Sequence, residues 1–373
     1  MNRICKQCAG GFEVTDDDLA FLEQIAPVYG GKKFQIPPPD FCPLCRLQRR
    51  MCFRNERSLY QRKCDGTGKN IISCYASGTD YIVYEHDYWW SDRWDSLSFG
   101  RNFDFSRTLT EQLKELNLAV PHSSLITANC LNCDYTNYFL NSKNCYLCFG
   151  GSHNENVMYG KFVVNCKNIV DGLSLVGCEM CYQGNSSQNC YGCRFFLQCR
   201  NCSDCLMMEE CLGCRNCVAC FGLRNKEYCF LNKYIGKEKF EKLVEEYKSL
   251  SHGQIADLQN RLDDLKKDLP HVQWHIYASE NCSGDVVMNS KNCKDCFSVR
   301  SGEDCQYVAF SPFASHCRDG IFSAPGPTEF CYQTCSIVGN SNCMSLFLVW
   351  GGGSNLYYCM ECHSCSDCFA CVG

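Results

Sequence analysis

Residues 189–225 read NCYGCRFFLQCRNCSDCLMMEECLGCRNCVACFGLRN, and this stretch decides the fold. It divides into units of equal length, each opening with a cysteine that follows Asn or Gly. Five such units begin at Cys166, Cys178, Cys190, Cys202 and Cys214, which is a constant spacing of twelve. A fixed short period is typical of a repeat architecture, in which each unit buries its apolar face against its neighbours. Most of the cysteines are therefore first explained as parts of a stack.

The same rhythm occurs elsewhere in the chain. Upstream, Cys133 and Cys145 keep the same spacing, and each follows an asparagine. A second array has units that begin at Cys282, Cys293, Cys305, Cys317, Cys331, Cys343, Cys359 and Cys371. Both arrays end in the pattern CxxCxxCxAC, at Cys211–Cys220 and again at Cys362–Cys371. This agreement indicates an internal duplication.

The repeats predict a β-solenoid. One unit is too short for a helix–turn–helix, and the units are rich in Cys, Phe, Tyr and Val. The Asn or Gly column marks a turn, because these residues tolerate left-handed backbone. Stacked asparagines can also satisfy one another's amides. A narrow coil made of one unit and a wider coil made of two units both fit this pattern.

The whole chain divides into four segments, which predict a mainly β protein. Residues 1–121 hold a zinc-ribbon-like domain with basic and aromatic stretches, 122–233 the first array, and 273–373 the second. Residues 234–272 contain no cysteine and carry Phe, Leu and Ile at helical spacing, with a break near Ser251. We expect a helical hairpin that packs on the first array. The leucines from Leu258 to Leu269 also allow a dimeric coiled coil.

The composition limits the location and the partners. The chain has 373 residues, 37 cysteines and a net charge of −5. It begins MNRICKQC, without the apolar core of a signal peptide, and no apolar run is long enough to cross a bilayer. We expect a cytoplasmic protein with reduced thiols and no membrane contact. The net charge provides no general attraction to nucleic acid.

Two CxxC pairs are the strongest metal signal. Cys5, Cys8, Cys42 and Cys45 could supply four thiolates to a tetrahedral structural zinc, as in zinc ribbons. The intervening loop is long, but the entropy of closing a loop rises slowly with its length. A redox pair and unliganded core cysteines are the alternatives. Four thiolates leave no open position for catalysis on the metal.

A basic stretch follows Cys45. If it is helical, Arg46, Arg50, Arg54 and Arg57 share one face, and Arg49 lies beside it. This surface could bind phosphate groups of a nucleic acid. A solvated face, or one paired with acidic neighbours, is the alternative.

The next stretch resembles a second ribbon that has lost ligands. Cys64 stands where a CxxC pair would begin, but Thr67 replaces its second cysteine. Cys64, Cys74 and His86 could still hold a metal. The tryptophans that follow, Trp89, Trp90 and Trp94, favour a small core or a docking face over a base-stacking platform.

Cysteines crowd at the end of each array. Soft thiolates there could bind Zn, Cu(I) or an iron–sulfur cluster. The candidate ligands are Cys211, Cys214, Cys217, Cys220, Cys359, Cys362, Cys365 and Cys368. Cysteine is also a small, buriable hydrophobe, so stacked columns of structural thiols explain the same runs. Redox disulfides are a third interpretation.

The strings CPLCRLQRR, FRNERSLYQRKCDGTGK, WWSDRWD and FGRNFDFSR, followed by NCxxCF repeats, resemble an uncharacterised cysteine-rich family of small-genome candidate-phylum bacteria. The resemblance covers most of the chain. It implies a cytosolic bacterial protein with a ribbon-plus-repeats layout, and it implies no activity.

The sequence carries no phosphate loop, nucleophile elbow, HExxH or dinucleotide fingerprint. We therefore expect a non-enzymatic, zinc-stabilised scaffold or protein-binding module, with a protein partner or self-association. Soft-metal storage on the CxxC clusters and nucleic-acid binding through the basic segment Arg46–Lys63 are the alternative functions.

Overall fold

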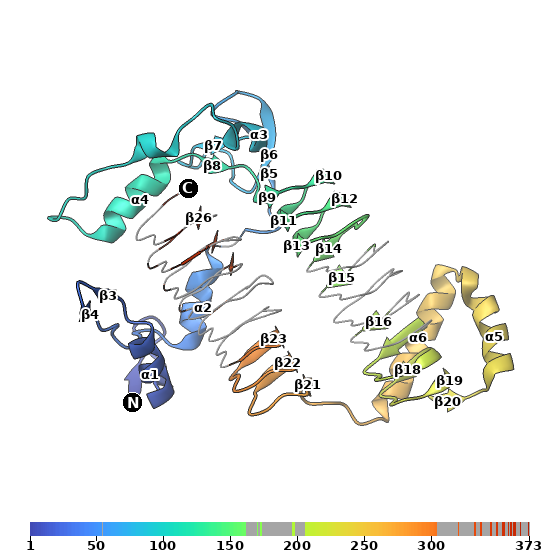
Figure 1. The fold of residues 1–373 in the computed structure, drawn as a ribbon. Helices are drawn as coiled ribbons and strands as arrows, with labels where there is room; N and C mark the ends of the chain where they lie inside the picture. The colour runs from blue at the N-terminus through green and yellow to red at the C-terminus, as the bar shows by residue number, and fades with distance from the viewer. Residues whose placement is uncertain are drawn as a thin grey trace.

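The computed structural model describes residues 1–53, 55–161 and 206–303. It also describes short pieces at 170, 172–173, 196–197, 320, 332, 336–337, 344, 348–349, 353–354, 357, 359, 361–362, 366 and 372. In this part of the chain 29% of residues are in strands and 24% in helices, so the described structure is mixed α and β. The expectation of a mainly β protein is corrected, because helices make up the insert and lie among the short strands of the N-terminal region (Figure 1).

The N-terminal region begins with an antiparallel hairpin of β1 (Asn2–Ile4) and β2 (Gly11–Glu13). Helix α1 (Asp16–Gln24) follows, and Thr15 and Asp18 close its first turn as a capping box. A small hairpin, β3 (Val28–Tyr29) and β4 (Lys32–Lys33), precedes α2 (Pro43–Met51).

A second antiparallel hairpin, β5 (Tyr60–Lys63) and β6 (Asn70–Ser73), follows α2. After it come β7 (Val83–Tyr84), α3 (His86–Trp89), the 3₁₀ helix η1 (Ser96–Phe99) and α4 (Leu109–Ala119). Strand β8 (His122–Ser123) pairs in parallel with β7.

The tryptophans form a small aromatic cluster at this point. The ring centroid of Trp89 lies 4.8 Å from that of Trp90 and 5.9 Å from that of Trp94. The indole N–H of Trp89 donates to the carbonyl of Pro121 at 3.2 Å, just before β8. Trp90 is 48% exposed, and Trp89 and Trp94 are half-buried, so the three rings form a cluster at the surface.

The first array contains parallel strands that pair with a partner exactly one repeat unit away in the sequence. Cys133 pairs with Cys145, and Cys217 with Cys229. The strands are β9 (Thr127–Ala128), β10 (Leu131–Asp134), β11 (Asn137–Leu140), β12 (Lys143–Tyr146), β13 (Phe149–Ser152), β14 (Gly160–Lys161), β15 (Gly172–Leu173), β16 (Phe196–Leu197), β17 (Leu206–Glu209), β18 (Arg215–Phe221) and β19 (Glu227–Phe230). Strand β20 (Lys233–Tyr234) ends this ladder antiparallel to β19. We call each repeat unit a coil. Because paired strands are one unit apart, they do not belong to the wider coil of two units.

The backbone turns at every third residue of these coils. Left-handed φ angles recur at Asn129, Asn132, Tyr135, Tyr138, Asn141, Asn144, Leu147, Gly150, His153, Asn156 and Tyr159. Each coil therefore has four corners. At the corners that carry asparagine, the amides bond from coil to coil, as from Asn132 to Asn144 at 3.1 Å and from there to Asn156 at 3.1 Å. The predicted asparagine stacking is confirmed at these positions.

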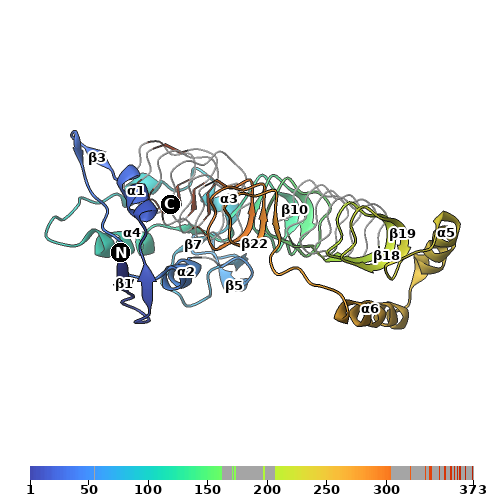
Figure 2. The same ribbon diagram turned by 90° about the horizontal axis from the view of Figure 1, so that it is seen from below.

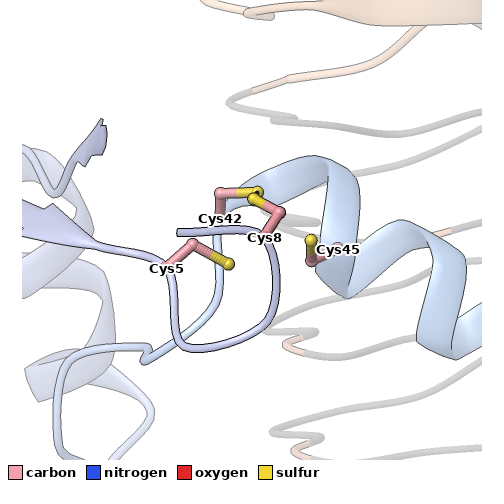
Figure 3. Close-up of side chains that lie close together, drawn as sticks. All are labelled: Cys5, Cys8, Cys42 and Cys45. Carbon is pink, nitrogen blue, oxygen red and sulfur yellow. Dashed lines mark hydrogen bonds between the residues drawn. The ribbon is translucent and has the colours of Figure 1, made fainter. Parts of the chain in front are cut away.

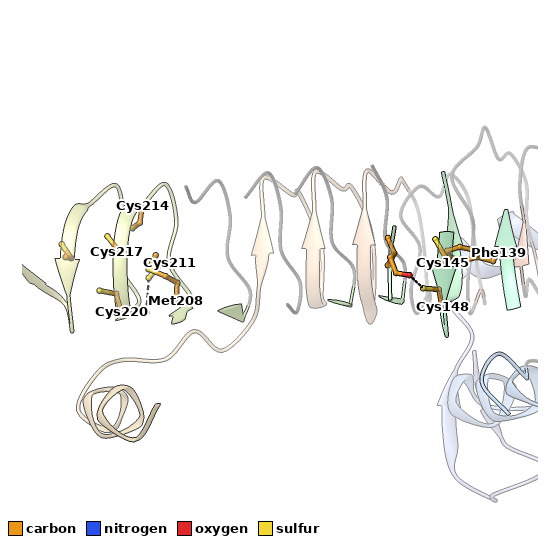
Figure 4. Packing of buried hydrophobic residues seen from close by; sticks show 10 residues of the cluster. Phe139, Cys145, Cys148, Met208, Cys211, Cys214, Cys217 and Cys220 are labelled. Carbon is orange, nitrogen blue, oxygen red and sulfur yellow. Dashed lines mark hydrogen bonds between the residues drawn. The ribbon is translucent and has the colours of Figure 1, made fainter. Parts of the chain in front are cut away.

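The residue after each corner faces the narrow interior. Cys148, Cys211, Cys214, Cys217 and Cys220 are fully buried there (Figure 4). The space inside is limited, so a large side chain needs a small neighbour. Phe139 lies opposite Gly151, where an added Cβ would approach the Phe139 ring to 2.7 Å. Cysteine suits this interior because it is small and apolar.

The insert consists of α5 (Lys237–Glu246), the 3₁₀ helix η2 (Tyr247–Ser249) and α6 (His252–Lys267). Phe240, Leu258 and Leu262 pack against the last coils of the first array. Lys266 also forms an ion pair with Glu209 at 2.6 Å. Leu258 and Leu262 of α6 are thus buried within the chain, as expected for packing on the array and unlike a coiled coil between two chains.

Replacing Leu262 by alanine is expected to reduce the free energy of unfolding by about 2–5 kcal/mol, because Leu262 is fully buried against the coils. Replacing Asp264, an exposed residue on the same helix, is expected to change it by less than about 0.5 kcal/mol. Urea denaturation followed by circular dichroism measures both. Equal effects would contradict the docking of α6.

The second array returns alongside the first (Figure 1). Its described strands are β21 (Ile276–Tyr277), β22 (Gly284–Met288), β23 (Cys296–Arg300), β24 (Ser336–Ile337), β25 (Leu348–Val349) and β26 (Glu361–Cys362). Val287 pairs with Val299, a full repeat unit further on, whereas Ile276 pairs with Val287, one position short of a full unit. The shorter step matches the shortened spacing between Cys282 and Cys293.

Helices α1 and α4 lie towards one end of the molecule and the insert lies at the other (Figure 2). Phe21 and Leu22 of α1 and the C-cap residue Ile25 pack against Tyr332 and Met344 of the second array. No helix in the described ranges combines the length and the apolar character that a membrane crossing needs.

Candidate metal centre

The first pair of cysteines lies in the turn of the β1–β2 hairpin. The Cys5 N–H donates to the Gly10 carbonyl at 2.9 Å, and the Ala9 N–H returns to the Cys5 carbonyl at 2.9 Å. Ala9 has a left-handed φ of 58°, which folds the turn tightly. Cys5 and Cys8 are thereby held on one side of the hairpin.

The second pair begins helix α2. Cys42 is the N-cap residue, Pro43 is at the first helical position, and Cys45 lies in the first turn. A CxxC pair at a helix start places both side chains on the same side, because they are three residues apart.

Polar contacts bring the two pairs together across the long loop. Arg3 forms an ion pair with Asp40 at 3.0 Å, and Lys6 forms one at 2.6 Å. The Lys6 N–H also donates to the Asp40 carbonyl at 3.0 Å. Sequence analysis missed this role of Asp40. The only signal for this role in the sequence is that Asp40 is acidic and lies two positions before Cys42, while its partners Arg3 and Lys6 flank Cys5.

The four sulfur atoms converge on one point (Figure 3). The Sγ atoms of Cys5, Cys8, Cys42 and Cys45 all lie within 4.8 Å of one another, and those of Cys8 and Cys42 are 3.8 Å apart. Tetrahedral zinc with Zn–S bonds of about 2.3 Å requires sulfur atoms about 3.8 Å apart. These cysteines could therefore hold a metal ion such as zinc, as the sequence predicts.

The surroundings of the sulfur atoms differ. Although burial raises the pKa of Cys5, N–H groups of Cys42, Cys8 and Gln7 lower it to about 6. Burial and the three neighbouring thiols raise the pKa of Cys45 to about 12. Cys5 thus favours the thiolate that a metal needs, whereas Cys45 must lose a proton when the metal binds.

Metal affinity is expected to fall as the pH falls. Each proton that zinc displaces weakens the apparent affinity about tenfold per pH unit, so the Cys45 proton alone costs about 100-fold between about pH 8 and pH 6. Competition with a chromophoric chelator measures this change. An affinity that stays constant over this range would contradict the raised pKa of Cys45.

The thiols of the described array cysteines make a different set of contacts. Cys211 Sγ lies 3.3 Å from the Glu209 carbonyl, two residues back, and 3.6 Å from the Cys220 carbonyl, nine residues on. Cys148 and Cys217 repeat these two contacts. Serine does the same from an equivalent position, since the Ser142 hydroxyl donates to the Leu140 carbonyl at 2.7 Å. A thiol that donates to a carbonyl carries its proton, so these contacts favour the structural thiol columns.

Neighbouring thiols within one coil shift each other's pKa values. A hydrogen bond to Cys217, together with burial, raises the pKa of Cys220, and the same bond lowers the pKa of Cys217. Cys145 and Cys148 are related in the same way. In each pair the thiol with the raised pKa keeps its proton more firmly than its neighbour does.

In the described residues, the candidate metal ligands of the arrays do not gather into a group of three or more that could share one ion. Among those residues, the group of three or more possible ligand side chains that could share one ion is the N-terminal one. Cys211, Cys214, Cys217 and Cys220 are buried on separate corners, and Cys359 is buried in the second array. Cys362 lies in β26, and Cys365 and Cys368 fall outside the described residues.

The predicted helical face of arginines does not form, because α2 is too short to include Arg57. The helix ends at Met51, and Asn55 then bonds to the N–H and carbonyl of Ser58 before β5. Arg50 is only 5% exposed. The Arg49 guanidinium lies 4.6 Å from the Phe41 ring centroid.

The other members of the predicted face have separate positions. Arg46 is half-buried in α2, Arg54 lies outside the described residues, and the Arg57 guanidinium lies 6.0 Å from the Phe149 ring centroid of the first array. The arginines therefore do not form one continuous helical face.

Cys64, Cys74 and His86, all in the described part of the chain, do not form a shared ligand group. Cys64 is buried at the turn of the β5–β6 hairpin. The His86 Nε2 atom lies 3.1 Å from the Thr127 carbonyl, at the start of the first array. The three-residue metal alternative is therefore not supported.

No known family, curated protein or solved structure matches this chain. The resemblance to the bacterial cysteine-rich family stays a prediction.

Proposed function

We propose that this chain is a non-enzymatic scaffold in which one zinc ion, bound by Cys5, Cys8, Cys42 and Cys45, fixes the N-terminal region on two β-solenoid arrays. The convergence of the four sulfur atoms within 4.8 Å carries this proposal. Four thiolates complete the coordination of zinc, so the metal would be structural. The parallel pairing of strands one repeat unit apart supports the solenoid interpretation.

The N-terminal region contacts both arrays. It contacts the second array through residues that precede Cys42 and the first array through residues that follow Cys45. Before Cys42, α1 packs on the second array, and the Tyr29 ring centroid lies 5.3 Å from that of Tyr357. After Cys45, the Asn137 amide donates to the Asn55 carbonyl at 2.9 Å, and Lys161 pairs with Glu56 at 3.1 Å. A metal between these two contact regions would keep them at a fixed separation, as a scaffold needs.

The long exposed faces of a repeat stack suit a protein partner, because neighbouring repeats build an extended surface. Soft-metal storage is the competing function. It requires the array thiols to give up the protons that they donate to carbonyls. Nucleic-acid binding is left without the continuous helical face of arginines that the sequence predicted for it.

Metal analysis of protein purified anaerobically, with a count of free thiols, separates these functions. The scaffold predicts about one zinc per chain and free array thiols. Many equivalents of metal, or loading with Cu(I) without loss of structure, would favour storage. Small-angle scattering after chelation tests the fixing role, because metal loss should expand the molecule while circular dichroism of the arrays persists.

A further inference from the structure

The β5–β6 hairpin repeats the backbone of the metal-binding β1–β2 hairpin. In the first hairpin Ile4, the residue before the first cysteine, pairs with Gly11. In the second, Lys63 precedes Cys64 and pairs with Asn70. Both pairs close a turn of six residues in which the cysteine is first.

The hydrogen bonds of the two turns also agree. Cys5 donates its N–H to the carbonyl five residues on at 2.9 Å, and Cys64 does so at 2.8 Å. Ala9 and Gly68, each four residues after the cysteine, return an N–H to the cysteine carbonyl at 2.9 and 2.8 Å. Both residues have left-handed φ angles, of 58° and 73°. Thr67 thus occupies the turn position of the second metal-ligating cysteine.

The helix that follows each hairpin starts in the same way. Cys42 is the N-cap of α2 with φ −64° and ψ 161°, and Glu85 is the N-cap of α3 with φ −59° and ψ 151°. Three residues later, Tyr88 stands where α2 carries Cys45. The four positions of the metal centre therefore all have counterparts.

The counterpart sulfur has the same backbone donors. The Glu85 N–H donates to Cys64 Sγ at 3.2 Å, and the N–H groups of Gly66 and Thr67 also lower the pKa of Cys64. Two of these donors lie in the turn and one at the N-cap, as for Cys5. Burial raises the pKa of Cys64, but the Thr67 side chain and these N–H groups lower it overall.

Aromatic packing fills the rest of the space. The Tyr88 ring lies so close to Gly66 that an added Cβ would approach it to 2.7 Å. Tyr84 meets Tyr88 edge-to-face at 4.8 Å between ring centroids. Lys69 pairs with Glu85 at 3.0 Å and ties the hairpin to the helix start.

We propose that Cys64, Thr67, Glu85 and Tyr88 occupy a second four-ligand zinc position, which this chain holds together with hydrogen bonds and aromatic packing in place of a metal. The site would accept zinc when its last three residues are cysteines. The inference does not depend on the metal content of the first site, because it rests on the agreement between the two backbones.

The triple variant Thr67→Cys, Glu85→Cys, Tyr88→Cys tests the site. Compared with the unchanged protein, it should bind about one further zinc per chain, and with Co²⁺ it should gain the absorption of a tetrathiolate site. The control adds Cys64→Ala to the same three changes and keeps the number of introduced thiols. The proposal is overturned if the triple variant gains no metal, or if the control gains as much.

The unchanged protein provides a second test that does not depend on folding of the variant. Chelation should make Cys5, Cys8, Cys42 and Cys45 react with an alkylating reagent, read by peptide mass spectrometry, while Cys64 stays protected. If chelation exposes Cys64 together with these four, the second hairpin depends on a metal and the proposal fails.

Discussion

Replacing Cys45 by serine is expected to abolish stoichiometric zinc binding and to loosen the N-terminal region from both arrays. Cys45 is buried, with its sulfur among the other three, so its loss leaves a three-thiolate site in a place that a hydroxyl fills poorly. Structural zinc sites supply about 10–16 kcal/mol of apparent binding free energy, so this is the largest single effect expected in the protein. Elemental analysis measures the metal, and hydrogen exchange of residues 1–53 measures the loosening.

Cys52→Ser is the matched control. Cys52 is exposed at the end of the same helix, and its Sγ lies 3.7 Å from the Gln48 carbonyl. This variant should keep its zinc and its exchange pattern. Full zinc occupancy in the Cys45 variant would instead show that the four sulfur atoms do not form the metal site.

The second large effect concerns the interior of the first array. Phe139→Ala is expected to reduce the free energy of unfolding by about 3–5 kcal/mol, because the ring fills the interior and is 1% exposed. Gly151→Val is expected to destabilise by about 1–3 kcal/mol, since its side chain would collide with that ring. The double variant should be more stable than the sum of the two effects predicts, by about 0.5–3 kcal/mol.

Denaturation of all four proteins, followed by circular dichroism, gives this coupling. The pair Phe139→Ala and Leu262→Ala is a suitable reference, because Leu262 packs in a different cluster and should show additive effects. Strict additivity of the Phe139 and Gly151 changes would mean that the two residues do not share one space.

The sequence predicted the length of the repeat because a column of Asn or Gly reveals a recurring turn. It did not predict the corners between these columns. Tyr135, Leu147 and Met207 have left-handed backbone, although their side chains carry no preference for it. Parallel pairing of neighbouring coils imposes this conformation, and a single unit of sequence does not contain that information.

The candidate metal centre was predicted from its two CxxC pairs, since a thiolate pair at that spacing has few structural alternatives. The basic face failed for the opposite reason. A spacing of four residues describes an exposed helical face and a buried one equally well, and Arg50 turned out to be buried. The sequence predicted that the second, ribbon-like hairpin had lost metal ligands. It did not predict that hydrogen bonds take the place of the metal, because those contacts depend on the folded structure.

The contacts of the array thiols have a consequence for how the protein is made. Cys148 takes one of its carbonyl contacts from Val157 and Cys211 takes one from Cys220, nine residues later in each case. During synthesis each coil therefore leaves its sulfur atoms uncovered until the ribosome has delivered the next one. The growing front of the stack is therefore the point at which these thiols are most open to an oxidant.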